Sequence, residues 1–399
     1  MDRVNTALLK LLSSSINCSP SSYVDLDPQE WQQLYEEAVA HQVHLIIFEE
    51  ANKYGKTVNP ELFDKWQKLT IYQTFENYRK YSIIGELFKA FEEANVPVMA
   101  LKGLFIKYLY PKPELRTMGD IDILIRRDSL DEAIDIIKSL GYEKTAKEDP
   151  KHLVFYHKHY VPIELHVSLV TESRRKLAKS LNTDIWEMPI HYEIDGISFL
   201  APNDINHLLY CCIHMTNHFG KGGFGLRQLT DFNLLARKLD KDADWDKIIE
   251  RAYLYGIGKF TQALLYVCHT LFSLDIPDSI KNEFEGNSSN IEILIQSILD
   301  AGVFGRKNPK IVNDRVLATY IHNNSSRTVN IFKYLFPSIN QLDVYYSYAK
   351  KHALLLPLAW AHRLIRNALR TDLKIKDRIP DTKSVNGYVE LFKWLDIKQ

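Results

Sequence analysis

Hydrophobic and polar positions change their spacing twice along the chain. Residues 1–96 and 201–399 carry apolar side chains at intervals of three and four, the spacing of amphipathic helices. Between them, residues 97–200 contain short apolar runs and alternating segments bounded by Pro and Gly, which are typical of strands and turns. The pattern predicts an α+β protein with three parts: an N-terminal helical region, a core with a small mixed β-sheet, and a C-terminal helical domain.

Within 97–200 the pattern also predicts the order of the elements. Pro97 ends the preceding helix, and the residues after it form a short apolar run. The expected elements are strand 98–101, helix 103–110, strand 120–126, helix 129–139, strand 142–146, an antiparallel pair near 152–158 and 161–168, and a last hairpin at 192–200.

The segment from Leu62 to Ala94 is long, periodic and rich in aromatic residues, which predicts a long helix. We expect its apolar stripe to be core rather than a surface for stacking bases. The stripe consists of Tyr72, Phe75, Tyr78, Tyr81, Ile84 and Leu87.

Composition limits the classes of protein to which the chain can belong. The chain has 399 residues, with 50 Lys and Arg against 50 Asp and Glu, so its formal net charge is zero. General nucleic-acid binders are usually basic, so DNA is not expected as a partner. The four cysteines form no Cys-x-x-Cys pair, which favours reduced thiols in the cytoplasm. We expect no signal peptide and no association with a membrane, because no uncharged run approaches about 18 residues.

Two acids mark the centre of the middle region. Asp120 and Asp122 lie in an alternating strand, so they share one face while Ile121, Ile123 and Ile125 point into the core. Such an Asp-x-Asp pair is common on exposed strands without any function. Two carboxylates side by side on one strand face repel each other, and a cation bound between them removes this cost. Oxygen ligands favour a hard cation, which predicts Mg²⁺ or Mn²⁺.

A third acid follows on a second alternating strand. Glu164 shares its face with His166 and Ser168. If this strand pairs beside the first, Glu164 completes a set of three carboxylates with Asp120 and Asp122. That set suits two-metal phosphoryl transfer, in which one ion activates the attacking hydroxyl and the other holds the triphosphate.

These motifs resemble a known family. The Gly-Asp-Ile-Asp at 119–122, with a Lys-Gly turn upstream, is similar to the nucleotidyltransferase superfamily of the DNA polymerase beta type. More narrowly, residues 100–103, 116–125 and 163–166 together resemble the bacterial "uncharacterised nucleotidyltransferase" family. The superfamily usually has Gly-Ser after the first strand, where Ser and backbone amides hold phosphate. Lys102 and Gly103 stand there instead, as in nucleotidyltransferase toxins of the abortive-infection type.

The resemblance implies a reaction and its ligands. The chain is expected to transfer an NMP from an NTP such as ATP to a hydroxyl group and to release pyrophosphate. Asp120, Asp122 and Glu164 would be both the catalytic residues and the metal ligands. The acceptor stays open between a small molecule, a peptide or protein, and RNA. The alternatives are a toxin-like enzyme that acts on tRNA and a non-catalytic binding protein on the same core.

Five residues are candidates for nucleotide binding. Lys102 could neutralise phosphate, and Gly103 would let it approach the backbone N–H groups of a helix start. Arg116 could pair with an acid or contact a phosphate. His166 could orient Glu164 or contact substrate.

The fifth candidate, His214, lies on a predicted helix between His207 and His218, and all three share one face. A zinc site there would lack a fourth ligand, so we expect His214 to contact nucleotide or acceptor beside the core. Arg227 and Asp231 are four residues apart on the next helix. They are expected to form a salt bridge or to face the same site.

Overall fold

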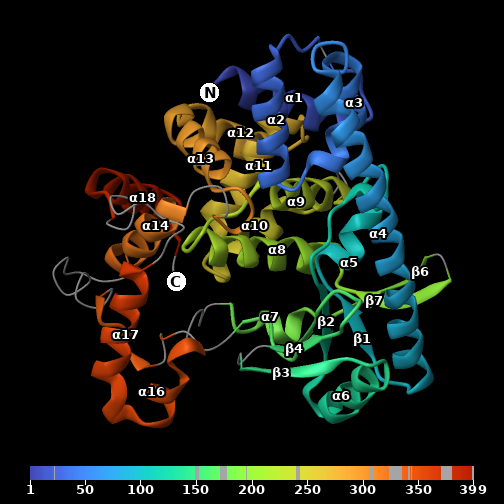
Figure 1. Cartoon of the computed structure of the whole chain (residues 1–399), viewed down its shortest axis with the longest axis vertical. Coiled ribbons are helices and arrows are strands. Elements are labelled where there is room, and N and C mark those ends of the chain that lie inside the picture. Colours follow the sequence, from blue (N-terminus) through green and yellow to red (C-terminus); the bar gives the residue numbers. More distant parts are fainter. Residues whose placement is uncertain are drawn as a thin grey trace.

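The computed structural model describes residues 1–21, 23–148, 152–170, 178–194, 196–239, 243–305, 309–322, 335–339, 342, 344–369 and 380–397. Figure 1 shows a sheet at one end of the molecule, helices from both ends of the chain packed together at the other end, and one long helix along the side. This arrangement confirms the predicted α+β class, in which helical regions precede and follow the mixed sheet along the chain.

Within the described residues the sheet has the strand order β3-β4-β5-β2-β1-β7-β6. The central strand β2 pairs antiparallel with β1 and parallel with β5, and β1 is parallel to β7. Every predicted strand is present, with ends shifted by a few residues. The strands are β1 (Val98–Ala100), β2 (Ile121–Ile125), β3 (Glu143–Glu148), β4 (His152–Tyr156), β5 (Ile163–His166), β6 (Ile190–Ile194) and β7 (Ile197–Ala201).

The two helices predicted between the strands, 103–110 and 129–139, also lie close to their predicted places. After β1 the chain forms α5 (Gly103–Ile106) and then a 3₁₀ turn at Lys107–Leu109. After β2 it forms α6 (Leu130–Ser139), and α7 (Leu181–Asp184) follows β5. The N-terminal helices are α1 (Arg3–Asn17), α2 (Pro28–Ala40), α3 (His44–Gly55) and α4 (Pro60–Glu93).

The prediction that the whole apolar stripe of α4 is core was wrong. Ile84 and Leu87 are buried, but Tyr72, Phe75 and Tyr78 are 62%, 61% and 55% exposed. The stripe advances by three residues per step, and each such step turns the side chain by about 60° around the helix axis. Six positions at that spacing therefore spread around most of the circumference, so one packed face cannot cover all of them.

The C-terminal helices α8 and α9 contact α7 and α5 of the middle region, and α11 contacts the N-terminal helix α1. One set of buried apolar side chains runs through all three parts of the chain. None of the described helices has the length and apolar character that crossing a membrane requires. The helices are α8 (Asp204–Phe219), α9 (Leu226–Lys238), α10 (Trp245–Leu254), α11 (Gly258–Phe272), α12 (Asp278–Glu285), α13 (Ser288–Ala301), α14 (Pro309–His322), α16 (Ser347–Lys351), α17 (Leu356–Ala368) and α18 (Thr382–Trp394).

Candidate active site

The pairing of β2 with β5 brings polar side chains together on one face of the sheet. Asp122 lies directly opposite Glu164, and the two strands are parallel neighbours, which meets the condition that the sequence argument set for Glu164. On the other side of β5, His152 of β4 lies opposite His166. Because alternate residues of a strand share a face, these four side chains form one polar cluster.

Asp122 is buried and accepts two hydrogen bonds from cationic or polar neighbours. Lys102 Nζ and His166 Nε2 each lie 2.8 Å from its Oδ1 atom. Burial disfavours the charged carboxylate, but the charge of Lys102 and these hydrogen bonds hold the pKa of Asp122 well below its usual range. Burial likewise opposes the charge of Lys102, whose pKa the Asp122 carboxylate nevertheless raises. The two groups therefore form a buried ion pair.

Glu164 is linked to the same cluster through histidines. Its Oε2 atom lies 3.6 Å from His166 Nε2 and 3.8 Å from His152 Nε2. Although burial favours the neutral carboxyl, the hydrogen bond from His166 lowers the pKa of Glu164. Burial opposes protonation of His166, but its contacts with Asp122 and Glu164 raise its pKa. The proton of this ring is accordingly assigned to Nε2, which faces the two carboxylates.

Asp120 comes immediately before β2 and is exposed to solvent. Protein atoms at longer range still reduce the hydration of its carboxyl. Together with the nearby charge of Asp122, this raises the pKa of Asp120 to about 6. The local excess of negative charge is the condition that a bound cation relieves.

Lys102 lies in the turn between β1 and α5 with a backbone φ of 46°. This is a region that favours glycine, so the conformation is strained for a lysine. The backbone N–H of Lys102 donates to Nε2 of His207 at 3.1 Å. Burial, with the charge of Lys238, lowers the pKa of His207 to about 3, so its ring is neutral and can accept this bond. The side chain of Lys102, rather than its backbone N–H, is therefore the group that faces the acids.

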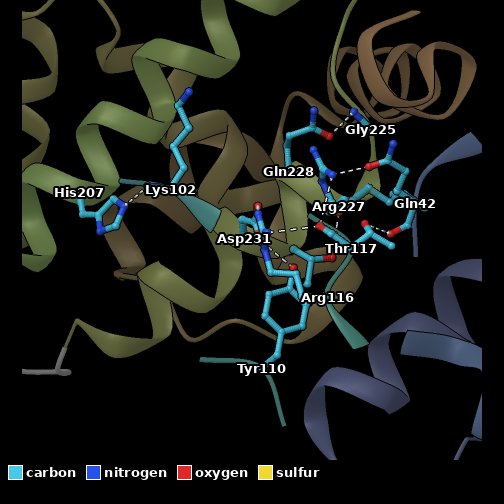
Figure 2. Close-up of polar contacts among 12 residues, drawn as sticks. Gln42, Lys102, Tyr110, Arg116, Thr117, His207, Gly225, Arg227, Gln228 and Asp231 are labelled. Carbon is cyan, nitrogen blue, oxygen red and sulfur yellow. Dashed lines mark hydrogen bonds and ion pairs between the residues drawn. The ribbon is translucent and has the colours of Figure 1, made fainter. Parts of the chain in front are cut away.

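Arg116 is not a member of this cluster but forms a buried ion pair with Asp231 of α9 (Figure 2). Its Nε and Nη2 atoms donate to the two Asp231 oxygens at 2.8 and 2.7 Å, and Tyr110 donates to the same carboxylate at 2.7 Å. A Cβ on Gly103 would lie 2.4 Å from Arg116 Nη1, so this glycine makes room for the guanidinium. The chain uses Arg116 to join the sheet region to α9.

The expected pairing within α9 was wrong, because Asp231 binds Arg116 rather than Arg227 (Figure 2). A spacing of four residues makes side chains neighbours on a helix, but tertiary packing decides which way each one points. Arg227 instead donates to the Gln42 side chain and to the backbone oxygen of Thr117 at 3.4 Å. Burial and the charge of Arg116 lower the pKa of Arg227, while Asp231 and Asp120 act in the opposite direction.

His214 lies one turn beyond Tyr210 on α8, half-buried beside His218. The Tyr210 ring is 5.8 Å from Lys102 Nζ and 6.3 Å from the His214 ring, so Tyr210 stands between His214 and the lysine of the cluster. Sequence reasoning did not select Tyr210 or His152. The alternation His152, Val154 across from Glu164 and His166 is the signal that could have found His152, once the hairpin register is assigned.

One group of three side chains in the described residues has ligand atoms placed for a metal ion. His152, Glu164 and His166 each offer an atom within 4.8 Å of the others. Asp120 and Asp122 are outside this group, although Asp122 touches it through His166. The donor set contains both oxygen and imidazole nitrogen atoms.

A mixed sheet with Asp122 on its central strand and Asp120 just before that strand is the arrangement expected of a nucleotidyltransferase. The chain belongs to the family described as "Uncharacterised nucleotidyltransferase", whose profile matches residues 27–273, more than half of the chain. The match confirms the resemblance seen in the motifs and establishes the protein as an enzyme of nucleotidyl transfer. It also includes α2 to α4 and α8 to α11, so the family extends into both flanking helical regions.

Two solved structures of the antibiotic-resistance factor ANT(2'')-Ia are similar to this chain. The solution structure has 13% identity and a TM-score of 0.35, and covers 49% of this chain and 98% of its own. The crystal structure with adenylyl-2''-tobramycin has 13% identity and a TM-score of 0.34, and covers 43% and 95%. Both scores are too low to say anything about the acceptor of this chain. A comparison with curated proteins gave no match.

Proposed function

We propose that this nucleotidyltransferase moves an NMP from an NTP to a hydroxyl-bearing acceptor in a reaction that depends on Mg²⁺ or Mn²⁺. In this proposal Asp120, Asp122 and Glu164 are the metal ligands and catalytic residues. The register of β2 with β5, which sets Asp122 opposite Glu164, carries the proposal. The raised pKa of Asp120, about 6, adds support, because after reduced hydration the negative charge of Asp122 contributes to it, and a bound cation would offset that charge.

The chemistry of the donors fits hard divalent ions. Carboxylate oxygens are the preferred ligands of Mg²⁺, and Mn²⁺ accepts them as well. When bound, such ions neutralise the triphosphate, lower the pKa of the attacking hydroxyl and stabilise the leaving pyrophosphate. Asp120 is the exposed member of the set and can meet a ligand that arrives from solvent.

The cationic side chains would bind the phosphates. Lys102 Nζ is already beside the acids, at 2.8 Å from Asp122, and can exchange that partner for a phosphate oxygen. Arg227 has neutral acceptors, Gln42 and Thr117, so its charge is not cancelled by a direct carboxylate partner among the described residues. His166 would keep Asp122 and Glu164 in place.

The remaining candidates would act around this centre. We assign His214 to contacts with nucleotide or acceptor, because it lies one turn from Tyr210 beside Lys102. Gly103 and Arg116 would support nucleotide binding by shaping the turn that carries Lys102, since the Arg116 guanidinium packs on Gly103. The acceptor is a small molecule, a peptide or protein, or an RNA. The net charge of zero favours the first two over tRNA.

The test is transfer of label from α-labelled ATP, GTP, CTP and UTP with Mg²⁺ or Mn²⁺, with and without cell extract. The proposal predicts metal-dependent labelling by the wild type and none by Asp120→Asn. Asp131→Asn, an exposed acid on α6, is the matched control and should label normally. Equal labelling by Asp120→Asn and wild type would remove the basis of the proposal. Label in an RNA fraction, with binding that weakens steeply with salt, would select the tRNA alternative.

A further inference from the structure

We propose that His152, Glu164 and His166 form a binding site for a first-row transition-metal ion, with Zn²⁺ and Co²⁺ bound more tightly than Mg²⁺. The proposed function needs only the three acids and a hard cation. This inference deepens it, because Glu164 belongs to both donor sets and because two imidazoles change which metal the site prefers.

The geometry comes from two adjacent strand pairs. His152 on β4 is the direct partner of His166 on β5, and Glu164 is two residues before His166 on the same face. The Glu164 Oε2 atom lies 3.8 Å from one imidazole Nε2 and 3.6 Å from the other. Ligand atoms bound to one ion at about 2.1 Å are separated by about 3 to 4 Å, so small rotations of these side chains suffice.

The donor chemistry selects the class of metal. Imidazole nitrogen suits Zn²⁺, Co²⁺, Fe²⁺ and Ni²⁺, whereas Mg²⁺ takes oxygen ligands. Two histidines with one carboxylate on one side of an ion leave positions open for water or a substrate oxygen. The side chains of His152 and Glu164 are only partly buried, so an ion can reach them from solvent.

The contacts with Asp122 place this ion within the proposed catalytic centre. Asp122 Oδ1 lies 2.8 Å from His166 Nε2, close enough to become a further ligand once that nitrogen binds the ion instead of donating a hydrogen bond. Lys102 holds the same oxygen at 2.8 Å and would be the group that is released. An ion here would therefore couple Asp122 to the phosphate-binding lysine.

The ring of His166 limits the affinity. Binding through Nε2 moves the ring proton to Nδ1, which is buried and has no hydrogen-bond partner among the described residues. Metal-binding histidines usually donate from the second nitrogen to an oxygen acceptor. We therefore expect an ion that exchanges with solvent rather than one retained through purification.

The experiment is titration of the full chain with Co²⁺, followed by its visible absorption, with Zn²⁺ and Mg²⁺ as competitors. We expect one Co²⁺ per chain, d–d bands of a nitrogen-containing site, displacement by Zn²⁺, and no displacement by a large excess of Mg²⁺. His152→Ala should weaken Co²⁺ binding about tenfold or more. His159→Ala, an exposed histidine in the connection from β4 to β5, is the matched control and should not change it.

Three results would overturn this inference: no Co²⁺ binding, Co²⁺ bands without nitrogen ligands, or unchanged Co²⁺ binding in His152→Ala. Nitrogen couplings in the pulsed EPR spectrum of the Mn²⁺-loaded wild type would show, without a variant, that imidazole nitrogen binds the ion. Mg²⁺-dependent NTP binding is measured on the same samples. Asp120 lies outside the histidine group, so Asp120→Asn should lose Mg²⁺-dependent NTP binding and keep Co²⁺ binding. Loss of the histidine site and failure of the proposed function therefore give different results.

Discussion

Two charged regions lie close together in this molecule and are built in opposite ways. At the Arg116–Asp231 pair, both charges are buried, every oxygen of the carboxylate has a donor, and Tyr110 adds a third hydrogen bond. On the face of β2 and β5, three carboxylates share Lys102 and two histidines, and the exposed Asp120 has its pKa raised to about 6.

The difference separates a structural ion pair from a candidate reaction centre. We call the Arg116–Asp231 pair the joint, because it connects the sheet region to α9. A buried pair with matched charges has no capacity left for a ligand, and it holds the sheet region against α9. A cluster with more negative than positive charge is unfavourable on its own and becomes favourable when a cation binds. Proximity of charged residues in the sequence does not distinguish the two, but their balance of charge in the structure does.

The largest expected effect is the loss of the joint. Asp231→Ala leaves the Arg116 guanidinium buried without its carboxylate, which should lower the free energy of unfolding by about 3–5 kcal/mol. Urea denaturation measures this. Asp278→Ala, an exposed acid on α12, should change stability by less than about 1 kcal/mol. If the two variants were equally stable, the joint would contribute no more than a surface pair.

The second effect tests whether Arg227 belongs to the reaction centre. Arg227→Met should weaken binding of an NTP and of inorganic tripolyphosphate by about tenfold or more, because a charged hydrogen-bond donor contributes about 1.5–3 kcal/mol. Calorimetric titration measures both ligands. Arg237→Met on the same helix is the control, since that guanidinium donates to a backbone oxygen of Phe272. Unchanged tripolyphosphate affinity in Arg227→Met would assign this residue to the joint instead.

A smaller effect concerns pH. Because the pKa of Asp120 is raised to about 6, the carboxyl is protonated below that pH, and the proton must leave before a cation binds. The apparent affinity for Mg²⁺ should therefore fall as the pH is lowered from 7 to 5, by up to about tenfold for one proton. Titrations of Mg²⁺ at fixed ionic strength measure this. In Asp120→Asn this component of the pH dependence should vanish.

The smallest expected effect is on the stability of the acidic cluster itself. Asp120→Asn removes one of several like charges, and within the described part of the chain the Asp120 side chain makes no hydrogen bond, so the free energy of unfolding should not fall by more than about 0.5 kcal/mol. Thermal denaturation without added metal is the measurement. A large loss of stability would mean that Asp120 supports the fold, and the contrast with Asp231 would disappear.

The sequence was sufficient for the part of the site that alternates along strands. The period of two along a strand places Glu164 and His166 on one face and keeps Asp122 on one face of its own strand. That the two strands are neighbours was only a condition of the sequence argument, and the structure supplies it. The same reasoning predicted every strand, with ends that differ by a few residues.

Partners from distant segments could not be predicted in this way. Arg116 and Asp231 are 115 residues apart, and only the packing of α9 on the sheet region brings them together. His207 reaches the Lys102 turn across 105 residues for the same reason. On α4, the sequence showed the spacing of the aromatic residues but not which side of the helix the rest of the chain covers, so the exposure of Tyr72 and Phe75 was missed.

The central claim is that the acids on β2 and β5 hold divalent cations for a nucleoside triphosphate. The most direct measurement is calorimetric titration of NTP into wild type and Asp120→Asn, each with and without Mg²⁺. The account predicts that Mg²⁺ strengthens NTP binding by the wild type and that this gain is lost in Asp120→Asn, with both proteins folded. An equal gain from Mg²⁺ in the two proteins would contradict it.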